Sequence, residues 1–293
     1  MFPRGVYPAA VTPFDAEGGI DQQSLARLLA WFEAGGCQGV VLAGTNGEGP
    51  SLSAVEKRDL VRAAMPLAGD LKVILGIATP SLNEAVWLTQ QAGKAGAAGV
   101  LVMPPSYFRS ASEEGLEAWF RSLADESPIP MLVYNFPKMT GLPISAELLG
   151  RLMSHTNIVG VKDSSGEREN LDGYRDVVPA DGVLFVGDET LLPAALEAGW
   201  SSTISGAANI ICHYLSRIVA AKEGEIAATF ELVLPVLQEL RRSPQPATNK
   251  AVLAALGILA RPDVRLPLLP VDGASSLQAL EDRLGIRPGV PLV

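Results

Sequence analysis

Short apolar runs rich in β-branched residues alternate with longer amphipathic segments along the first 206 residues of this 293-residue chain. This alternation is typical of βαβ units that build a parallel sheet. Eight such units close into a (β/α)8 barrel, which usually takes about 250 residues. The sequence therefore predicts an α/β fold, a (β/α)8 TIM barrel, with strands in "GVYPAAVT", "GVVLAG", "KVILGIA", "GVLVMP", "PMLVYN", "IVGVK", "VLFVG" and "STISG".

The rival architecture is an open, doubly wound sheet. It would need a glycine-rich dinucleotide-binding turn after the first strand, and the first unit has none. Helix starts are marked instead between the predicted strands. Ser53 with Glu56 and Ser81 with Glu84 have the spacing of a capping box, and Ser145 opens a further helix.

The last part of the chain reads as helical, with stretches such as "ATFELVLPVLQELRR" and "ATNKAVLAALGIL". No linker-like composition separates it from the strand-rich part. We therefore predict a barrel over residues 1–224 that carries the active site. Residues 225–293 are predicted to form a C-terminal helical extension packed on the barrel.

Composition excludes several classes of function. The formal net charge is −9, from 23 basic and 32 acidic residues, without a basic cluster, so neither nucleic acid nor membrane is an expected partner. No secretory h-region or membrane-length apolar run is present. Cys37 and Cys212 stand in apolar surroundings, as reduced core thiols of a cytoplasmic protein do. His155 and His213 lie apart from other potential ligands, so no metal site is expected.

Polar residues follow the predicted strands at the ends where a barrel has its active site. These ends are "GTNGE" after strand two, "PPSY" after strand four, "YN" at the end of strand five, "KD" at the end of strand six, "GD" after strand seven and "SG" at the end of strand eight.

Strand six leads directly from an apolar run into Lys162, although lysine is rarely buried without a partner. The ordinary interpretation is a side chain that extends its ammonium to water. Alternation along the strand indicates otherwise. Ile158, Gly160 and Lys162 share one face, and Val159 and Val161 share the other. If the two valines face the helices, Lys162 points into the mouth of the barrel.

The same alternation turns Tyr134 inward on the neighbouring strand, and adjacent strands lie about 4.8 Å apart. A neutral lysine amine attacks a ketone to form a Schiff base, and a nearby tyrosine can move the protons. Backbone N–H groups of the Gly44–Gly47 turn suit a substrate carboxylate. Each feature alone has an ordinary structural explanation, but together they favour Schiff-base chemistry by Lys162 and Tyr134.

The chain also resembles the dihydrodipicolinate synthase and N-acetylneuraminate lyase family of pyruvate-handling class I aldolases. The ordered set that carries the resemblance covers nearly the whole chain. It consists of "AAVTPF", "GTNGEGPSLS", "PPSYF", "YNFPKMTG", "GVKDSSG", "STISGAAN" and "RLPLLPV".

The resemblance implies that Lys162 is the Schiff-base lysine and Tyr134 the proton-shuttling tyrosine. Thr45 matches a hydroxyl residue that relays protons. The turn at Thr45 and Asn46 matches the site of the pyruvate carboxylate, with Gly47 beside it. In many members of the family a tyrosine matching Tyr107 enters the active site of the neighbouring subunit, which implies a homo-oligomer, either a dimer or a tetramer.

Further substrate contacts are implied by position. Ile204, before Ser205, matches a position that lines the pocket, and both are predicted to contact substrate. Two residues depart from the family pattern. Asn46 replaces a second hydroxyl residue, and Met139 replaces the arginine that binds the aldehyde's carboxylate in dihydrodipicolinate synthases. Lys138 is a neighbouring cation, but its side chain is expected to point elsewhere.

The leading hypothesis is therefore an aldolase or lyase that forms a Schiff base with pyruvate or a longer 2-oxo acid, without a cofactor. The substrate would be a 2-keto-3-deoxy sugar acid or 4-hydroxy-2-oxoglutarate. The alternative is dihydrodipicolinate synthase itself, which condenses pyruvate with aspartate semialdehyde. A pyridoxal-phosphate enzyme would need a phosphate cradle, which the sequence does not offer. A non-catalytic 2-oxo-acid sensor on the same scaffold is a remote alternative.

Overall fold

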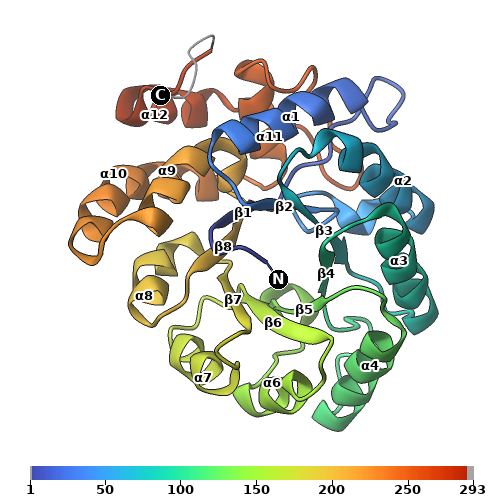
Figure 1. Ribbon diagram of the computed structural model, residues 1–293. Helices are drawn as coiled ribbons and strands as arrows, with labels where there is room; N and C mark the ends of the chain where they lie inside the picture. Colours follow the sequence, from blue (N-terminus) through green and yellow to red (C-terminus); the bar gives the residue numbers. More distant parts are fainter. Residues whose placement is uncertain (1, 289–293) are drawn as a thin grey trace.

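The computed structural model describes residues 2–288, and within them eight parallel strands form a barrel with helices around it (Figure 1). Each strand pairs with its neighbours in chain order, from β2 round to β8 and then β1. A parallel bridge between Ala9 and Val41, with a 2.9 Å hydrogen bond from Ala10 N–H to Val41 O, joins β1 to β2 and closes the ring. All eight predicted strands are confirmed: β1 Val6–Pro8, β2 Gly39–Leu42, β3 Lys72–Ile77, β4 Gly99–Val102, β5 Met131–Asn135, β6 Ile158–Asp163, β7 Val183–Val186 and β8 Ser202–Ser205.

Helices follow the strands as the capping signals predict. Ser53 and Glu56 form the complete capping box, with each side chain accepting from the other residue's backbone N–H. Ser81 caps its helix, but the carboxylate of Glu84 accepts from the hydroxyl of Thr79, so that capping box is only half formed. The helices are α1 Gln22–Ala34, α2 Ala54–Ala64, α3 Leu82–Ala95, α4 Glu113–Glu126, α5 Pro137–Thr140, α6 Ala146–Met153, α7 Glu169–Val177, α8 Leu192–Glu197, α9 Ala208–Ala220, α10 Glu223–Arg242, α11 Ala247–Ala255 and α12 Ala274–Leu284. Over the described residues, none of these helices combines the length and the hydropathy needed to cross a membrane.

Two apolar layers hold the barrel together. The larger layer packs the helices onto the outside of the strands. The smaller one fills the interior with side chains from alternate strand positions, as in other barrels of this type. Its members are Phe2, Tyr7, Ala9, Val41, Ile74, Leu101, Leu132, Tyr134, Phe185 and Ile204. This interior is a packed core, so a ligand must bind above it, at the carboxyl ends of the strands.

The expected alternation along β6 is wrong at the start of the strand and right at its end. Met131 pairs with Ile158, but the next residue, Leu132, pairs with Gly160, so β6 has one extra residue there. Such a bulge shifts the side chains before it to the opposite face. Ile158 therefore packs in the helix-facing layer and Val159 toward the interior. After the bulge the predicted alternation holds, with Lys162 on the interior side.

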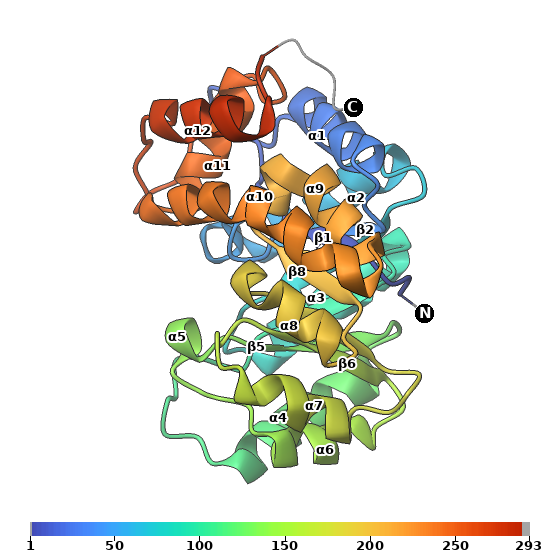
Figure 2. The ribbon, with the colours of Figure 1, turned by 90° about the vertical axis from the view of Figure 1, so that its left-hand side faces the viewer.

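The C-terminal helices α10, α11 and α12 lie beside the barrel, and α11 and α12 lie on the side away from the N-terminus (Figure 2). The division at residue 224 stays a prediction, and residues 289–293 of the proposed extension lie outside the described residues. The expectation that the barrel alone carries the site is incomplete, because α10 and α11 also line the cavity described below.

A buried ion pair fixes α11 to the barrel. Lys250 Nζ lies 2.5 Å from Glu48 Oε1, and both side chains are fully buried. The ammonium also donates to Asp263 O at 2.7 Å and lies 4.0 Å from the ring centroid of Phe14. Burial lowers the pKa of Lys250 to about 8, although Glu48 opposes the shift. Glu48 belongs to the turn after β2, so the pair joins that turn to α11.

Replacing one member of this pair should destabilise the protein strongly. Lys250→Met leaves the Glu48 carboxylate buried without its counter-charge, which typically costs about 3–5 kcal/mol. The free energy of unfolding, measured in urea, should fall by that amount. The double variant Glu48→Gln with Lys250→Met should recover most of the loss. Arg242→Met, which breaks an exposed ion pair with Glu239, is the control and should change the free energy little. An equal, small effect of Lys250→Met and Arg242→Met would contradict this role.

Candidate active site

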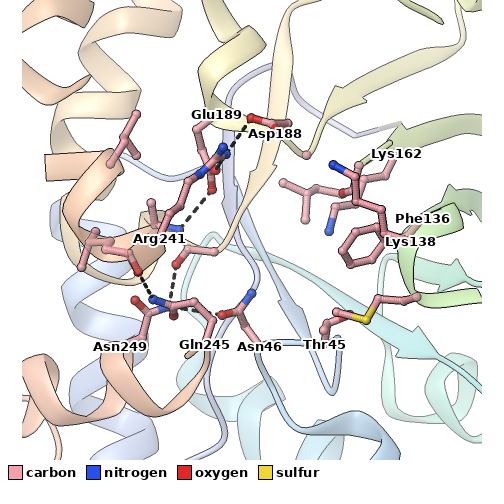
Figure 3. Close-up of a pocket in the computed structure, with 18 of the residues that line it drawn as sticks. Thr45, Asn46, Phe136, Lys138, Lys162, Asp188, Glu189, Arg241, Gln245 and Asn249 are labelled. Carbon is pink, nitrogen blue, oxygen red and sulfur yellow. Dashed lines mark hydrogen bonds and ion pairs between the residues drawn. The ribbon is translucent and has the colours of Figure 1, made fainter. Parts of the chain in front are cut away.

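A cavity of about 520 Å³ opens at the carboxyl ends of the strands (Figure 3). Polar and charged side chains from the barrel and from the C-terminal helices face it, above the apolar interior. Its lining consists of Thr45, Asn46, Tyr134, Phe136, Lys138, Met139, Lys162, Ser164, Gly187, Asp188, Glu189, Ile204, Gly206, Ala207, Leu237, Leu240, Arg241, Gln245 and Asn249.

Lys162 and Tyr134 meet at this cavity. They are directly paired across β5 and β6, and the Lys162 Nζ atom lies 4.0 Å from the centroid of the Tyr134 ring. Both residues are buried, with exposed fractions of 5% and 4%. Gly187, which directly follows the next strand, β7, leaves room for the lysine, because a Cβ there would lie 2.9 Å from Lys162 Cε. The amine of Lys162 therefore lies at the cavity next to the phenol of Tyr134, although both side chains are otherwise buried.

A side-chain hydrogen bond between the last residues of β5 and β6 stabilises this pairing. Asn135, next to Tyr134, donates to the carboxylate of Asp163 at 2.7 Å, and Asp163 is next to Lys162. Asp163 also accepts from the backbone and hydroxyl of Ser165. Burial raises the pKa of Asp163 even though these hydrogen bonds oppose the shift. Asp163 thus holds the ends of β5 and β6 in register and points away from the cavity.

The turn after β2 offers unused donors. Thr45 and Asn46 line the cavity, and within residues 2–288 their backbone N–H groups donate to no backbone acceptor. Consecutive free N–H groups in a tight turn form an anion-binding concavity. This geometry suits the substrate carboxylate that the turn was predicted to bind.

Three predicted site residues lie off the cavity of their own chain. Gly47 packs against the first strand segment, where a Cβ would lie 2.8 Å from Ala10 O. Ser205 faces the helices, because it is next to the inward-pointing Ile204, and its hydroxyl donates to Glu189 at 2.6 Å. Tyr107 is 79% exposed, with its ring edge-on to Phe108. Its role in a neighbouring subunit stays a prediction.

Met139 and Lys138 both line the cavity, so the expectation that Lys138 points elsewhere is wrong. The two residues form most of the short helix α5, and one tight turn of helix brings successive side chains to the same rim. Met139 is 56% exposed there. No ion pair of Lys138 is present in the described part of the chain.

Several cavity residues were not predicted, because they come from the C-terminal helices or follow β7. Arg241 of α10 donates to Asp188 at 2.6 Å and to Glu189 at 2.8 Å. Burial alone would raise the pKa of Asp188, but the hydrogen bonds from Arg241 and Thr190 lower it below its ordinary value. The three paired side chains, one cation and two carboxylates, carry a formal charge of −1, and Lys138 is a further cation of the same cavity. The "GD" after strand seven was the one sequence signal for it.

Comparison with known proteins agrees with this geometry. Residues 2–284 match the model of the dihydrodipicolinate synthetase family. The chain belongs to that family. Within it, the chain is 34% identical to the 4-hydroxy-tetrahydrodipicolinate synthase of Sodalis glossinidius (strain morsitans), over 95% of this chain and 98% of the relative. It is 32% identical to the synthase of Methanosarcina acetivorans, over 97% and 99%.

Solved structures of the dihydrodipicolinate synthetase family superpose closely on this fold. The prophage protein YagE of Escherichia coli K12, solved in complex with pyruvate, has a TM-score of 0.91 at 26% identity, with 97% of this chain and 99% of that one covered. Dihydrodipicolinate synthase from Aquifex aeolicus gives a TM-score of 0.91 at 27% identity, covering 98% and 100%. The protein is thus an enzyme of the class I, Schiff-base, pyruvate-dependent aldolases and lyases.

Removal of the Tyr134 hydroxyl should impair catalysis while leaving the fold intact. Tyr134→Phe should lower kcat by roughly 10²–10⁴-fold, the range for a lost general acid or base. Tyr7→Phe is the matched control. Tyr7 lies in the same barrel interior, but its hydroxyl donates to Pro3 O away from the cavity. Near-normal turnover of folded Tyr134→Phe would show that the hydroxyl has no part in proton transfer.

Proposed function

We propose that the protein is a Schiff-base aldolase that cleaves or forms a hydroxylated 2-oxo acid with pyruvate as the three-carbon partner. The observation that carries this proposal is the buried amine of Lys162, at the floor of the cavity and against the ring of Tyr134. Lysine is a costly residue to hold there unless its amine is used.

The geometry supports a sequence of steps. The substrate carboxylate binds the free N–H groups of Thr45 and Asn46, which brings the 2-oxo carbon to Lys162. The amine adds to this carbon, and Tyr134 moves protons as water leaves and the iminium forms. Tyr134 then accepts the C4 hydroxyl proton as the C3–C4 bond breaks, and the electron pair of that bond moves into the iminium to give an enamine. Protonation at C3 and hydrolysis release pyruvate and the aldehyde, and restore the amine.

The cavity side chains away from Lys162 favour a substrate with a neutral, hydroxylated tail over one with a second carboxylate. Met139 cannot supply the paired, charge-assisted hydrogen bonds that an arginine gives a carboxylate. Arg241 is already bound to Asp188 and Glu189, so its charge is balanced. A carboxylate next to Arg241, Asp188 and Glu189 would meet the formal charge of −1 of that group, whereas a hydroxyl can donate to either carboxylate. A 2-keto-3-deoxy sugar acid fits these requirements.

The second candidate function is 4-hydroxy-tetrahydrodipicolinate synthase. It is favoured by the names of relatives at 30–34% identity, and by Lys138, a cation on the cavity rim next to Met139. In that reaction Lys138 would bind the carboxylate of aspartate semialdehyde in place of the missing arginine.

We also propose, from the resemblance alone, that the enzyme is a cytoplasmic homo-oligomer in which Tyr107 contributes to a neighbouring subunit. The exposed Tyr107 and Phe108 side chains are compatible with such a contact.

A substrate comparison tests the proposed function. The kcat/KM for cleavage of 2-keto-3-deoxygluconate, followed by pyruvate release, should exceed that for condensation of pyruvate with aspartate semialdehyde. The expected margin is roughly ten- to a hundredfold, the worth of one hydrogen bond to a charged group. Lys162→Met serves as the inactive control for both reactions.

A preference for the semialdehyde would overturn the proposed substrate and support the second candidate. Lys138→Met would then distinguish the source of that preference. If Lys138 binds the carboxylate, this variant should lose activity toward the semialdehyde selectively.

A further inference from the structure

Ser164 follows β6 directly and is a cavity residue that the sequence did not predict. Its backbone N–H donates to Asn135 O at 2.8 Å, which continues the pairing of β6 with β5 by one residue. Side chains alternate along such a segment, so Ser164 lies on the same face as Lys162, two residues earlier. The Ser164 side chain is half-buried and lines the cavity. A hydroxyl therefore stands at the cavity beside the reacting amine.

This hydroxyl contacts the phenol of Tyr134. Ser164 Oγ donates to the Tyr134 hydroxyl oxygen at 3.5 Å, and within residues 2–288 this is the one side-chain hydrogen bond of that phenol. The distance is long for two hydroxyl groups, but hydrogen bonds between catalytic groups often shorten only when the substrate binds. No hydrogen bond joins Thr45 to Tyr134 in the described part of the chain, so Ser164 is the hydroxyl that the structure connects to the phenol.

Gly187 keeps Ser164 and Lys162 close to each other. A Cβ at position 187 would lie 2.0 Å from Ser164 Oγ and 2.9 Å from Lys162 Cε. The serine hydroxyl and the end of the lysine chain thus share the space that a side chain at this position would need. Ser164 Oγ therefore borders both groups of the proposed chemistry, the phenol and the amine.

We propose that Ser164 is a positioning residue that stabilises the oxygen of Tyr134 whenever this phenol has given up its proton. The inference rests on the role of Tyr134 in the proposed function, but not on which aldehyde is formed. When the carbinolamine becomes an iminium, its C–O bond breaks, and the leaving hydroxyl takes the Tyr134 proton and departs as water. The nitrogen lone pair forms the C=N bond, and the Tyr134 oxygen is left negative.

A negative oxygen at this position needs a donor from the protein. Tyr134 is 4% exposed, so little water reaches it, and an unpaired buried charge is costly. The Ser164 hydroxyl already points its O–H at this oxygen, and a hydrogen bond becomes stronger when its acceptor is ionised. The bond is thus worth more after proton transfer than before it, which is the condition for accelerating a step.

The test follows imine formation with pyruvate, because this step does not depend on the aldehyde. Protein and saturating pyruvate are mixed, borohydride is added after set intervals, and the reduced adduct is measured by mass. Ser164→Ala should slow adduct formation by roughly ten- to a hundredfold, the worth of one hydrogen bond to a charged group. The final yield of adduct should stay the same, because the amine of Lys162 is untouched.

The Tyr134→Phe variant shows whether Ser164 acts through the phenol. With the phenol oxygen absent, Ser164→Ala should change the rate by less than about twofold, the limit within which independent effects add. Ser165→Ala is the matched control, because its hydroxyl donates to Asp163 at 2.7 Å and it does not line the cavity. Any slowing by Ser165→Ala should be equal with and without the Tyr134 hydroxyl.

Each outcome decides the matter. Equal slowing by Ser164→Ala with and without the Tyr134 hydroxyl would mean that Ser164 only supports the loop, and would overturn the inference. No slowing, a lower final yield, or the same dependence on Tyr134 in Ser165→Ala would overturn it too. Ser164→Gly, which also lacks the hydroxyl, replaces Ser164→Ala if the alanine variant does not fold.

Failure of the proposed function gives a different result. If the unaltered protein forms the imine but does not cleave 2-keto-3-deoxygluconate, the proposed substrate is wrong, and the imine rates still decide the role of Ser164. If it forms no imine with pyruvate, the proposed function and this inference both fail.

Discussion

The pairing of β5 with β6 is the interaction on which the active site depends. It places Tyr134 directly opposite Lys162, and the hydrogen bond from Asn135 to Asp163 fixes the register one residue further on. A slip of one residue would turn the amine to the helices and leave it buried among apolar side chains. The bulge at the start of β6 contributes to the same arrangement. It accommodates the extra residue before Lys162, so that Lys162 and Asp163 pair regularly with β5.

A second constraint brings the C-terminal helices into the site. Lys162 and Tyr134 belong to the barrel, but part of the cavity lining comes from α10 and α11. Arg241 links α10 to the carboxylates after β7, and the ion pair of Lys250 and Glu48 links α11 to the turn after β2. The fold therefore separates two tasks. We propose that the strand ends hold the reacting amine and phenol, while helices that come later in the chain shape selectivity.

The sequence predicts what local patterns encode. All eight strands, the capping box at Ser53, and the juxtaposition of Lys162 with Tyr134 follow from alternation and from the common edge of parallel strands. The position of Ile158 was wrong because a bulge depends on the neighbouring strand. Ser205 was placed at the pocket because the neighbouring Ile204 lines it, although alternation turns the two in opposite directions.

Other parts of the site have no local signal at all. Arg241 and Asn249 lie on helices whose sequences read as ordinary amphipathic segments. Their side chains reach the cavity only because the C-terminal helices fold back onto the barrel, a tertiary contact between residues about 200 positions apart. Lys138 was misplaced because one turn of helix, α5, follows β5 and brings both Lys138 and Met139 to the rim.

The central claim is that Lys162 forms an imine with a 2-oxo acid. The most direct measurement is borohydride reduction of the unaltered protein in the presence of pyruvate, followed by peptide mass analysis. The account predicts one reduced pyruvyl adduct, located on the peptide that contains Lys162 and absent when borohydride or pyruvate is left out. An unmodified Lys162 peptide, with the adduct on Lys138 or another lysine, would contradict it.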